Sequence, residues 1–268
     1  MSIQESSRVA LVTGGGSGIG AAVATRLSAM GWKVVICGRR KESLEAVAER
    51  TGAEPIVCDI SDDTQVAALV DNVVNRFARL DGLVLNAGVI ASGKVGDLSI
   101  DDWHNMVSIN LTGSFYVARN CLPHLLSSRG AIVSVASEAA LRASSEMSCY
   151  SATKAALLML TQSLAVDYGA EGLRANVVCP GWTVTEMADE EMASFGGGRG
   201  LSVDDAYRLI TSLVPLQRPA RADEVASVIA FLLSEDSSYV NGAVIPVDGG
   251  GIAVDPATVP YDPRVSID

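Results

Sequence analysis

Short apolar runs alternate along the chain with longer segments of helical spacing. The apolar runs lack the polar alternation of a half-exposed strand, which indicates strands that are buried on both faces. They lie at 9–12, 33–36, 55–57, 83–85, 131–135, 174–178 and 243–247, and the helical segments lie at 18–30, 41–51, 63–79, 101–127, 150–170 and 222–234. This repeat predicts one α/β domain with a doubly wound, seven-stranded, mainly parallel sheet and helices on both faces.

Two segments depart from this rhythm. The stretch Phe195–Gly200 is rich in glycine, which predicts a mobile loop. The tail 255–268 contains Pro256, Pro260 and Pro263, and proline disfavours regular helix, so we expect an extended or irregular tail. The domain is therefore predicted to span 1–254.

Composition narrows the classes of partner and the location. The 268 residues are 49% hydrophobic with a net charge of −11, which argues against binding to nucleic acid or to an anionic membrane surface. The five cysteines include no CxxC motif and there are two histidines, so we expect reduced cysteines and no metal site. The first residues, MSIQESSR, lack the pattern of a signal peptide, and no apolar run has membrane-spanning length. We therefore expect a cytoplasmic protein.

A glycine-rich turn joins the first strand to the first helix. It runs Thr13-Gly-Gly-Gly-Ser-Gly-Ile-Gly20. Glycine lets the backbone approach a ligand closely, and the N–H groups that begin a helix favour a pyrophosphate. A glycine cluster can also be an ordinary turn, but its position between strand and helix favours a dinucleotide site.

Tyr150 and Lys154 are four residues apart in a segment of helical pattern. Positions i and i+4 share one face of a helix. An ammonium close to a phenol lowers the tyrosine pKa, which we expect to make Tyr150 a proton donor or acceptor near neutral pH. A surface pair without chemistry is the alternative interpretation.

These motifs, taken together, resemble the short-chain dehydrogenases/reductases in their compact single-domain branch. The resemblance rests on the order of TGGGSGIG, Asn86-Ala-Gly88, Asn110, Ser137, the YxxxK pair and Pro180-Gly181, and it spans Arg8 to about Gly251. Similar members include 3-oxoacyl-ACP-reductase-like and carbonyl-reductase-like proteins. The resemblance implies a Rossmann-type fold and hydride transfer between a nicotinamide cofactor and a carbonyl or carbinol carbon.

The resemblance also implies four catalytic residues. Tyr150 would exchange the proton with the substrate oxygen, and Lys154 would lower the tyrosine pKa and bond the nicotinamide ribose. Ser137 would position the oxygen, and Asn110 would hold a water that links Lys154 to solvent. Without the resemblance, an asparagine within a helix would indicate a mild defect or a kink.

The cofactor contacts implied by the resemblance come from six places in the chain. Asp59 would contact adenine, although a helix cap or turn is the alternative. Pro180-Gly181 could be only a turn, and Asn86 could serve the sheet as well as the cofactor. The full set is Gly14, Gly16, Ser17, Gly18, Ile19, Gly20, Arg39, Arg40, Asp59, Ile60, Asn86, Ala87, Gly88, Tyr150, Lys154, Pro180, Gly181, Thr183 and Thr185.

The end of the second strand favours NADP(H) over NAD(H). An acidic residue there selects NAD by bonding the ribose 2′-OH, but this chain has Gly38 followed by Arg39 and Arg40. A guanidinium can pair a 2′-phosphate, and Arg39 matches the basic position of NADP-preferring relatives. Ser17 departs from the pattern, because some of those relatives carry a second basic residue there. Solvated arginines at a helix start are the alternative.

Residues 186–215 match the family's variable substrate lid. Ser137, Met147, Trp182 and Met187 are candidates for the substrate pocket, although the last three could equally be core or lid packing. Glu138 and Arg142 flank the expected pocket mouth, where charges are usually solvated. A pocket lined mostly by apolar side chains favours an apolar ketone or secondary alcohol over a sugar phosphate as substrate. Relatives are commonly tetramers, so we expect a homotetramer or homodimer, and the tail could reach a neighbouring subunit or be a frayed terminus.

Three other functions fit parts of the pattern. An NAD-dependent alcohol dehydrogenase of the same family would differ at the ribose contact. A non-catalytic dinucleotide-binding protein would share the fold, but such proteins typically lose the tyrosine or the lysine. A dehydratase or epimerase for nucleotide-sugars usually needs a longer chain with a distinct substrate domain.

Overall fold

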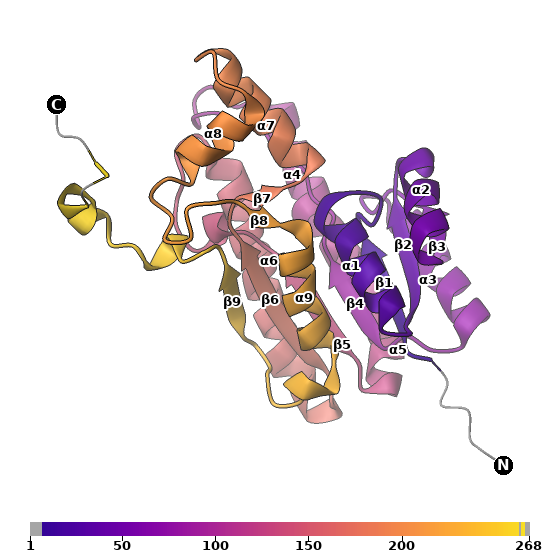
Figure 1. Cartoon of the computed structure of the whole chain (residues 1–268). Helices are drawn as coiled ribbons and strands as arrows, with labels where there is room; N and C mark the ends of the chain where they lie inside the picture. Colours follow the sequence, from indigo (N-terminus) through magenta and orange to yellow (C-terminus); the bar gives the residue numbers. More distant parts are fainter. Residues whose placement is uncertain (1–6, 263, 266–268) are drawn as a thin grey trace.

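The computed structural model describes residues 7–262, 264 and 265. Within these residues, seven strands form one fully parallel sheet in the order β3-β2-β1-β4-β5-β6-β9 (Figure 1). Their bounds are β1 (Val9–Thr13), β2 (Lys33–Gly38), β3 (Glu54–Val57), β4 (Gly82–Leu85), β5 (Ala131–Val135), β6 (Arg174–Pro180) and β9 (Val244–Val247). The doubly wound α/β prediction and the seven predicted strands are confirmed.

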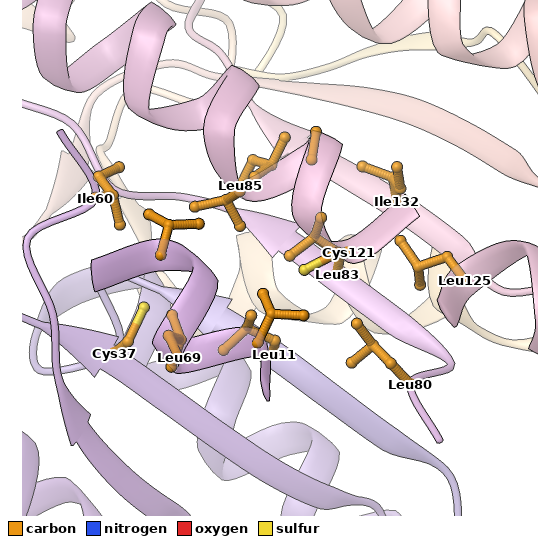
Figure 2. Close-up of a cluster of buried hydrophobic side chains, with 14 of the residues drawn as sticks. Leu11, Cys37, Ile60, Leu69, Leu80, Leu83, Leu85, Cys121, Leu125 and Ile132 are labelled. Carbon is orange, nitrogen blue, oxygen red and sulfur yellow. The ribbon is translucent and has the colours of Figure 1, made fainter. Parts of the chain in front are cut away.

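Helices cover both faces of this sheet. One face carries α1 (Gly18–Ala29), α2 (Lys41–Thr51) and α9 (Ala222–Leu233), and the other carries α3 (Asp63–Phe77), α5 (Ser114–Ser128) and α6 (Ser148–Tyr168). Successive strand residues point to opposite faces of the sheet and pack in two hydrophobic cores. Leu11 packs in the core under α3, whereas Ala10 and Val12 pack in the core under α1. Figure 2 shows Leu11 and Leu83 of the strands beside Leu69 of α3 and Leu125 of α5. The apolar runs are continuous because both faces are buried.

The predicted helix at 101–127 is three pieces in the structure. A short helix α4 (Ile100–Met106) passes into a π-helical segment, Val107–Gly113, before α5 begins. Gly113 lies against the turn after β3, since a Cβ placed on it would be 2.8 Å from Ile60 Cγ1. The wider π turn re-aims the side chains of this segment, which periodicity at 3.6 residues cannot reveal.

The segment predicted as a mobile lid is mainly helical. It contains α7 (Glu186–Gly197) and α8 (Val203–Ile210), with a small core of Met192, Ala206 and Tyr207 between them. Two short strands, β7 (Thr183–Val184) and β8 (Ala220–Arg221), pair at its base. The expectation of a glycine-rich loop from Phe195 is wrong at its start, because α7 continues to Gly197. Mobility of the remaining turn stays a prediction.

The tail also differs from its prediction. Pro256–Tyr261 form a 3-10 helix whose first turn is capped by Asp255, which accepts a hydrogen bond from the Ala257 backbone N–H (3.0 Å). Proline is tolerated in the first turn of a helix, where its missing N–H has no partner to lose. Residues 263 and 266–268 lie outside the described part of the chain, as does most of the N-terminal stretch examined for a signal peptide.

Two searches of the described residues bear on the partner predictions. None of the helices described here combines the length and apolar character needed to cross a bilayer. No group of three or more His, Cys, Asp or Glu side chains within the same residues could hold a metal ion. All five cysteines are buried as free thiols.

Candidate active site

A cavity of about 670 Å³ opens at the carboxyl ends of the central strands. The strand order reverses between β1 and β4, and ligands of doubly wound sheets bind at such a reversal. Gly20 and Asn110 do not line it. The other predicted site residues do: Gly14, Gly16, Ser17, Gly18, Ile19, Arg39, Arg40, Asp59, Ile60, Asn86, Ala87, Gly88, Ser137, Met147, Tyr150, Lys154, Pro180, Gly181, Trp182, Thr183, Thr185 and Met187.

The backbone of the glycine turn has a conformation that would let a ligand approach it closely. Gly14 and Gly18 adopt φ of +64° and +51°, which side chains with a Cβ rarely tolerate. A Cβ on Gly18 would lie 3.0 Å from Thr185 Cγ2 across the cavity. Helix α1 begins without a side-chain cap, which leaves its first N–H groups for a ligand. Gly20 serves packing instead, because a Cβ there would lie 2.2 Å from the Gly14 carbonyl oxygen.

Asn86 and Asp59 both have structural partners in addition to their place in the cavity wall. Asn86 Nδ2 donates to the carbonyl oxygens of Thr13 (2.9 Å) and Gly14 (3.2 Å), so it ties β4 to the glycine turn. Asp59 accepts hydrogen bonds from the backbone N–H and the hydroxyl of Ser61 (3.0 and 2.7 Å). The turn alternative for Asp59 is therefore observed, and its contact with adenine stays a prediction.

The two arginines after β2 differ in their partners. Arg40 Nη2 donates to Ser17 Oγ (3.1 Å) and to Glu186 Oε2 (2.9 Å), and so joins the glycine turn to the start of α7. Arg39 is exposed at the cavity wall and makes no ion pair with any residue that the structure describes. The Arg39 guanidinium, which has no ion-pair partner among the described residues, is therefore available to bind an anionic group of a ligand.

Tyr150 and Lys154 both face the cavity from the first turns of α6. Lys154 is buried, with 4% exposed, and its Nζ donates to the Val135 carbonyl oxygen at the end of β5 (2.9 Å). That Nζ is 5.7 Å from the centroid of the Tyr150 ring. The prediction that Tyr150 and Lys154 share one face of a helix is confirmed. The carbonyl oxygen of Val135 in β5 holds the Lys154 ammonium in place.

The expected direction of the Tyr150 pKa is wrong for this structure. Burial raises the pKa of Tyr150 to about 12, although a hydrogen bond with Ser137 acts to lower it. Burial also lowers the pKa of Lys154 to about 8. Burial is the main cause of both shifts, and Lys154 directs its ammonium to the Val135 carbonyl oxygen. Tyr150 is therefore a neutral phenol at neutral pH.

Asn110 lies behind the cavity wall in the π-helical segment. Its Oδ1 accepts from the Val89 backbone N–H (2.8 Å), and its Nδ2 donates to the Val89 carbonyl oxygen (2.9 Å). A second bond from Nδ2 reaches Thr153 Oγ1 of α6 (3.2 Å). Asn110 thus fixes the segment that follows β4 relative to α6. Its predicted role in a water relay stays a prediction.

Several residues that line the cavity beside α7 also stabilise the local structure. Thr185 Oγ1 caps α7 by accepting from the Ala188 backbone N–H (3.2 Å), and Thr183 Oγ1 donates to the Gly181 carbonyl oxygen (3.0 Å). Trp182 packs against the lid core while lining the cavity. The two alternatives for Trp182, core and pocket, are therefore both true.

Sequence reasoning missed several cavity residues. Ser144 lines the wall, and Glu138 is half-buried in it rather than solvated at the mouth. Glu190 and Glu191 line it from α7, three and four residues after Met187. Helical spacing from Met187 would have identified both, had the segment been predicted as a helix.

Comparisons with known proteins agree with this geometry. The family model described as "Enoyl-(Acyl carrier protein) reductase" matches residues 14–251. The chain belongs to the short-chain dehydrogenase/reductase family. It is 37% identical over 252 residues to meso-2,3-butanediol dehydrogenase of Serratia marcescens, covering 93% of this chain and 96% of that protein. It is also 37% identical over 254 residues to levodione reductase of Leifsonia aquatica, covering 91% and 93%.

A solved structure shows the same fold. A crystal structure of an actinorhodin polyketide ketoreductase variant with NADPH aligns with a TM-score of 0.87 and 33% identity, covering 91% of this chain and 97% of that one. The chain is thus a short-chain dehydrogenase/reductase, an oxidoreductase that uses a nicotinamide cofactor on CH–OH and C=O groups.

Proposed function

We propose that this chain is an NADP-dependent oxidoreductase that moves a hydride between nicotinamide and a ketone or secondary alcohol, with Tyr150 as the general acid/base. The observation that carries the proposal is the convergence of Ser137, Tyr150 and Lys154 on one cavity whose other end is the glycine turn. Relatives named for alcohols, ketones and ketoreductase activity support the reaction type.

The cofactor, when bound, supplies or accepts the hydride; the protein's own residues handle the proton and the orientation. A phenol whose pKa is raised to about 12 stays protonated across neutral pH, which suits Tyr150 to donate a proton to a carbonyl oxygen. Ser137, which lines the same cavity as that phenol, orients the substrate oxygen toward it. Lys154, held by Val135 beside the phenol, supplies positive charge when Tyr150 gives up its proton.

The cavity fits a dinucleotide with a 2′-phosphate. Its cradle offers Gly14 and Gly18 with positive φ in the cavity wall and uncapped N–H groups of α1. At the same end of the cavity, Arg39 lies in the wall without an ion-pair partner among the described residues, and no acidic side chain directly follows β2. These features support NADP(H) over NAD(H).

Replacing Tyr150 tests the proton-transfer role. We expect Tyr150→Phe to keep NADPH binding, measured by cofactor fluorescence, and to lose about 10²- to 10⁴-fold in turnover. The assay follows NADPH consumption over a panel of ketones and aldehydes. Full activity of this variant would remove Tyr150 from the mechanism, and no activity of the wild type on any carbonyl would favour the non-catalytic alternative.

Replacing Arg39 tests the cofactor choice. We expect the wild type to show a higher kcat/KM for NADPH than for NADH, and Arg39→Ala to reduce that ratio about 10-fold or more through loss of a charge-assisted contact. Arg50→Ala, an exposed arginine in the last turn of α2, is the matched control. Equal efficiency with both cofactors, or an unchanged ratio in Arg39→Ala, would favour the NAD-dependent alternative.

Other parts of the proposal rest on the family. We propose that 186–215 acts as the substrate lid and that the protein is a cytoplasmic homotetramer or homodimer. Sedimentation of the purified protein measures its oligomeric state, and a monomer would contradict the proposal.

A further inference from the structure

Carboxylates wall the end of the cavity that lies around Tyr150. Glu138 comes directly after Ser137 at the end of β5, and Glu190 and Glu191 come from the inner face of α7. Glu138 and Glu191 are half-buried, whereas Glu190 is exposed. Two independent elements thus bring acidic side chains to the place where the substrate of the proposed reaction must bind.

Glu138 is held against glycine backbone. A Cβ placed on Gly181 would lie 3.1 Å from Glu138 Oε2, and one placed on Gly251 would lie 3.4 Å from the same atom. The neighbouring Asp248 is satisfied by the backbone N–H groups of Gly250 (2.9 Å) and Ile252 (2.8 Å). Asp248 therefore stays in place and offers Glu138 repulsion rather than a bond.

No cation of the described residues neutralises these carboxylates. Neither Glu138 nor Glu191 has a side-chain hydrogen bond or ion pair within residues 7–262, 264 and 265. Of the nearby cations, Lys154 donates to Val135, and Arg142 donates to the Val254 carbonyl oxygen (3.0 Å). Arg39 and Arg40 lie at the cofactor end of the cavity.

Both carboxylates act on the reacting group. The negative charges of Glu191 and Glu138 each contribute to raising the pKa of Tyr150. Burial raises the pKa of Glu138 and of Glu191, and Asp248 raises that of Glu138 further. Two partly desolvated acceptors within electrostatic reach of the phenol gain most from a ligand that brings them a hydrogen-bond donor.

We propose that Glu138, with Glu191, forms an acceptor subsite beside Tyr150, and that the substrate carries a hydroxyl or ammonium group on the carbon next to the reacting carbinol or carbonyl carbon. This proposal rests on the oxidoreductase function above and deepens it. The same carboxylates repel a substrate with a carboxylate or phosphate at that position, because like charges are screened only weakly in a partly buried site. Donor-bearing substrates are preferred and anions are rejected.

A matched ring series tests the subsite. We would measure kcat/KM with NADP⁺ at pH 8, where the acids are ionised, for cyclohexanol, trans-1,2-cyclohexanediol, trans-2-aminocyclohexanol and trans-2-hydroxycyclohexanecarboxylate. We expect the diol, the amino alcohol or both to exceed cyclohexanol about 10-fold, and the carboxylate to fall below it. The better of the two donor-bearing compounds identifies the donor as a hydroxyl or an ammonium.

Two variants assign the preference to Glu138. Glu138→Gln keeps the side-chain shape but loses the charge, so we expect the ratio of diol to cyclohexanol to fall several-fold and the relative rate on the carboxylate to rise. Glu171→Gln makes the same change at an exposed residue after α6, remote from the cavity lining, and should leave both ratios unchanged. Unchanged ratios in Glu138→Gln would remove Glu138 from the subsite.

Failure of the subsite and failure of the function have different signatures. If cyclohexanol is oxidised as well as the diol and the amino alcohol, the subsite is overturned while the oxidoreductase function stands. If no ring compound turns over, ligand-observed NMR of the same four compounds with the NADP⁺-loaded protein measures the preference without chemistry. Equal binding, or tighter binding of the carboxylate, would then overturn the subsite.

Discussion

The two halves of the cavity are built in different ways. The half that we propose for the cofactor is largely backbone: glycines after β1, the ends of β2 and β4, and the start of α1. The substrate half consists of side chains from β5, α6 and the lid helix α7, and the lid rests on a small core of its own around Tyr207. Backbone geometry leaves a motif in the sequence, whereas a wall of side chains depends on how distant elements pack.

One contact joins the two halves. The Arg40–Glu186 ion pair links the start of α2, on the cofactor side, with the first residue of α7. Both side chains are more than half exposed, with 62% and 61% of their surface accessible, so the pair contributes little to stability. Because Arg40 also lines the cavity, we expect the pair to affect cofactor binding more than folding.

The glycines of the two halves should respond in opposite ways to added bulk. Gly20→Ala forces a Cβ to within 2.2 Å of the Gly14 carbonyl oxygen, so we expect it to lower the free energy of unfolding by about 3 kcal/mol or more. Gly197→Ala, at the end of α7 with nothing within 4 Å of its Cβ, should be neutral or stabilise by about 0.5–1 kcal/mol. Urea denaturation measures both, and equal effects would contradict the distinction.

Lys154 should make the stability of the catalytic region depend on pH. Its folded pKa of about 8 lies below the ordinary 10.5, so between these values the unfolded chain binds more protons, and stability rises with pH. We expect Lys154→Met to reduce the gain in unfolding free energy from pH 7.5 to 9.5 by about 1–2 kcal/mol. Because Tyr150 has a raised pKa, its own contribution falls only as pH passes from 10 to about 12. An identical pH dependence in the variant would show that Lys154 does not titrate in this range.

The smallest effect is expected where the halves meet. Glu186→Gln removes the partner of Arg40 and frees its guanidinium, so we expect NADPH to bind about 2- to 5-fold more tightly, with a smaller change for NADH. Fluorescence titration with both cofactors measures the ratio. The control is Glu42→Gln, which changes an exposed glutamate in the first turn of α2. A ratio that stays constant would place Arg40 away from the 2′-phosphate.

Prediction from the sequence succeeded for features that leave a recognisable motif or periodicity in the chain. The strands and the glycine turn could be predicted from local patterns, and the resemblance to the family predicted that Ser137, Tyr150 and Lys154 lie in one cavity. The π-helical segment that carries Asn110 could not, because its widened turn comes from packing against Ile60 and Val89. Likewise, the pKa of Tyr150 depends on burial, which no spacing of residues expresses.

The sequence by itself determined a parallel α/β sheet, a glycine-rich turn between its first strand and first helix, and a tyrosine–lysine pair on one helical face, because these follow from apolar periodicity, glycine conformational freedom and helix geometry. Only the tertiary structure decided that Lys154 bonds Val135, that Arg40 rather than Arg39 is paired, and that Glu138 and Glu191 line the same cavity as Tyr150. Those outcomes depend on distances between segments far apart in the chain and on the loss of water around them, and both are set when the elements pack.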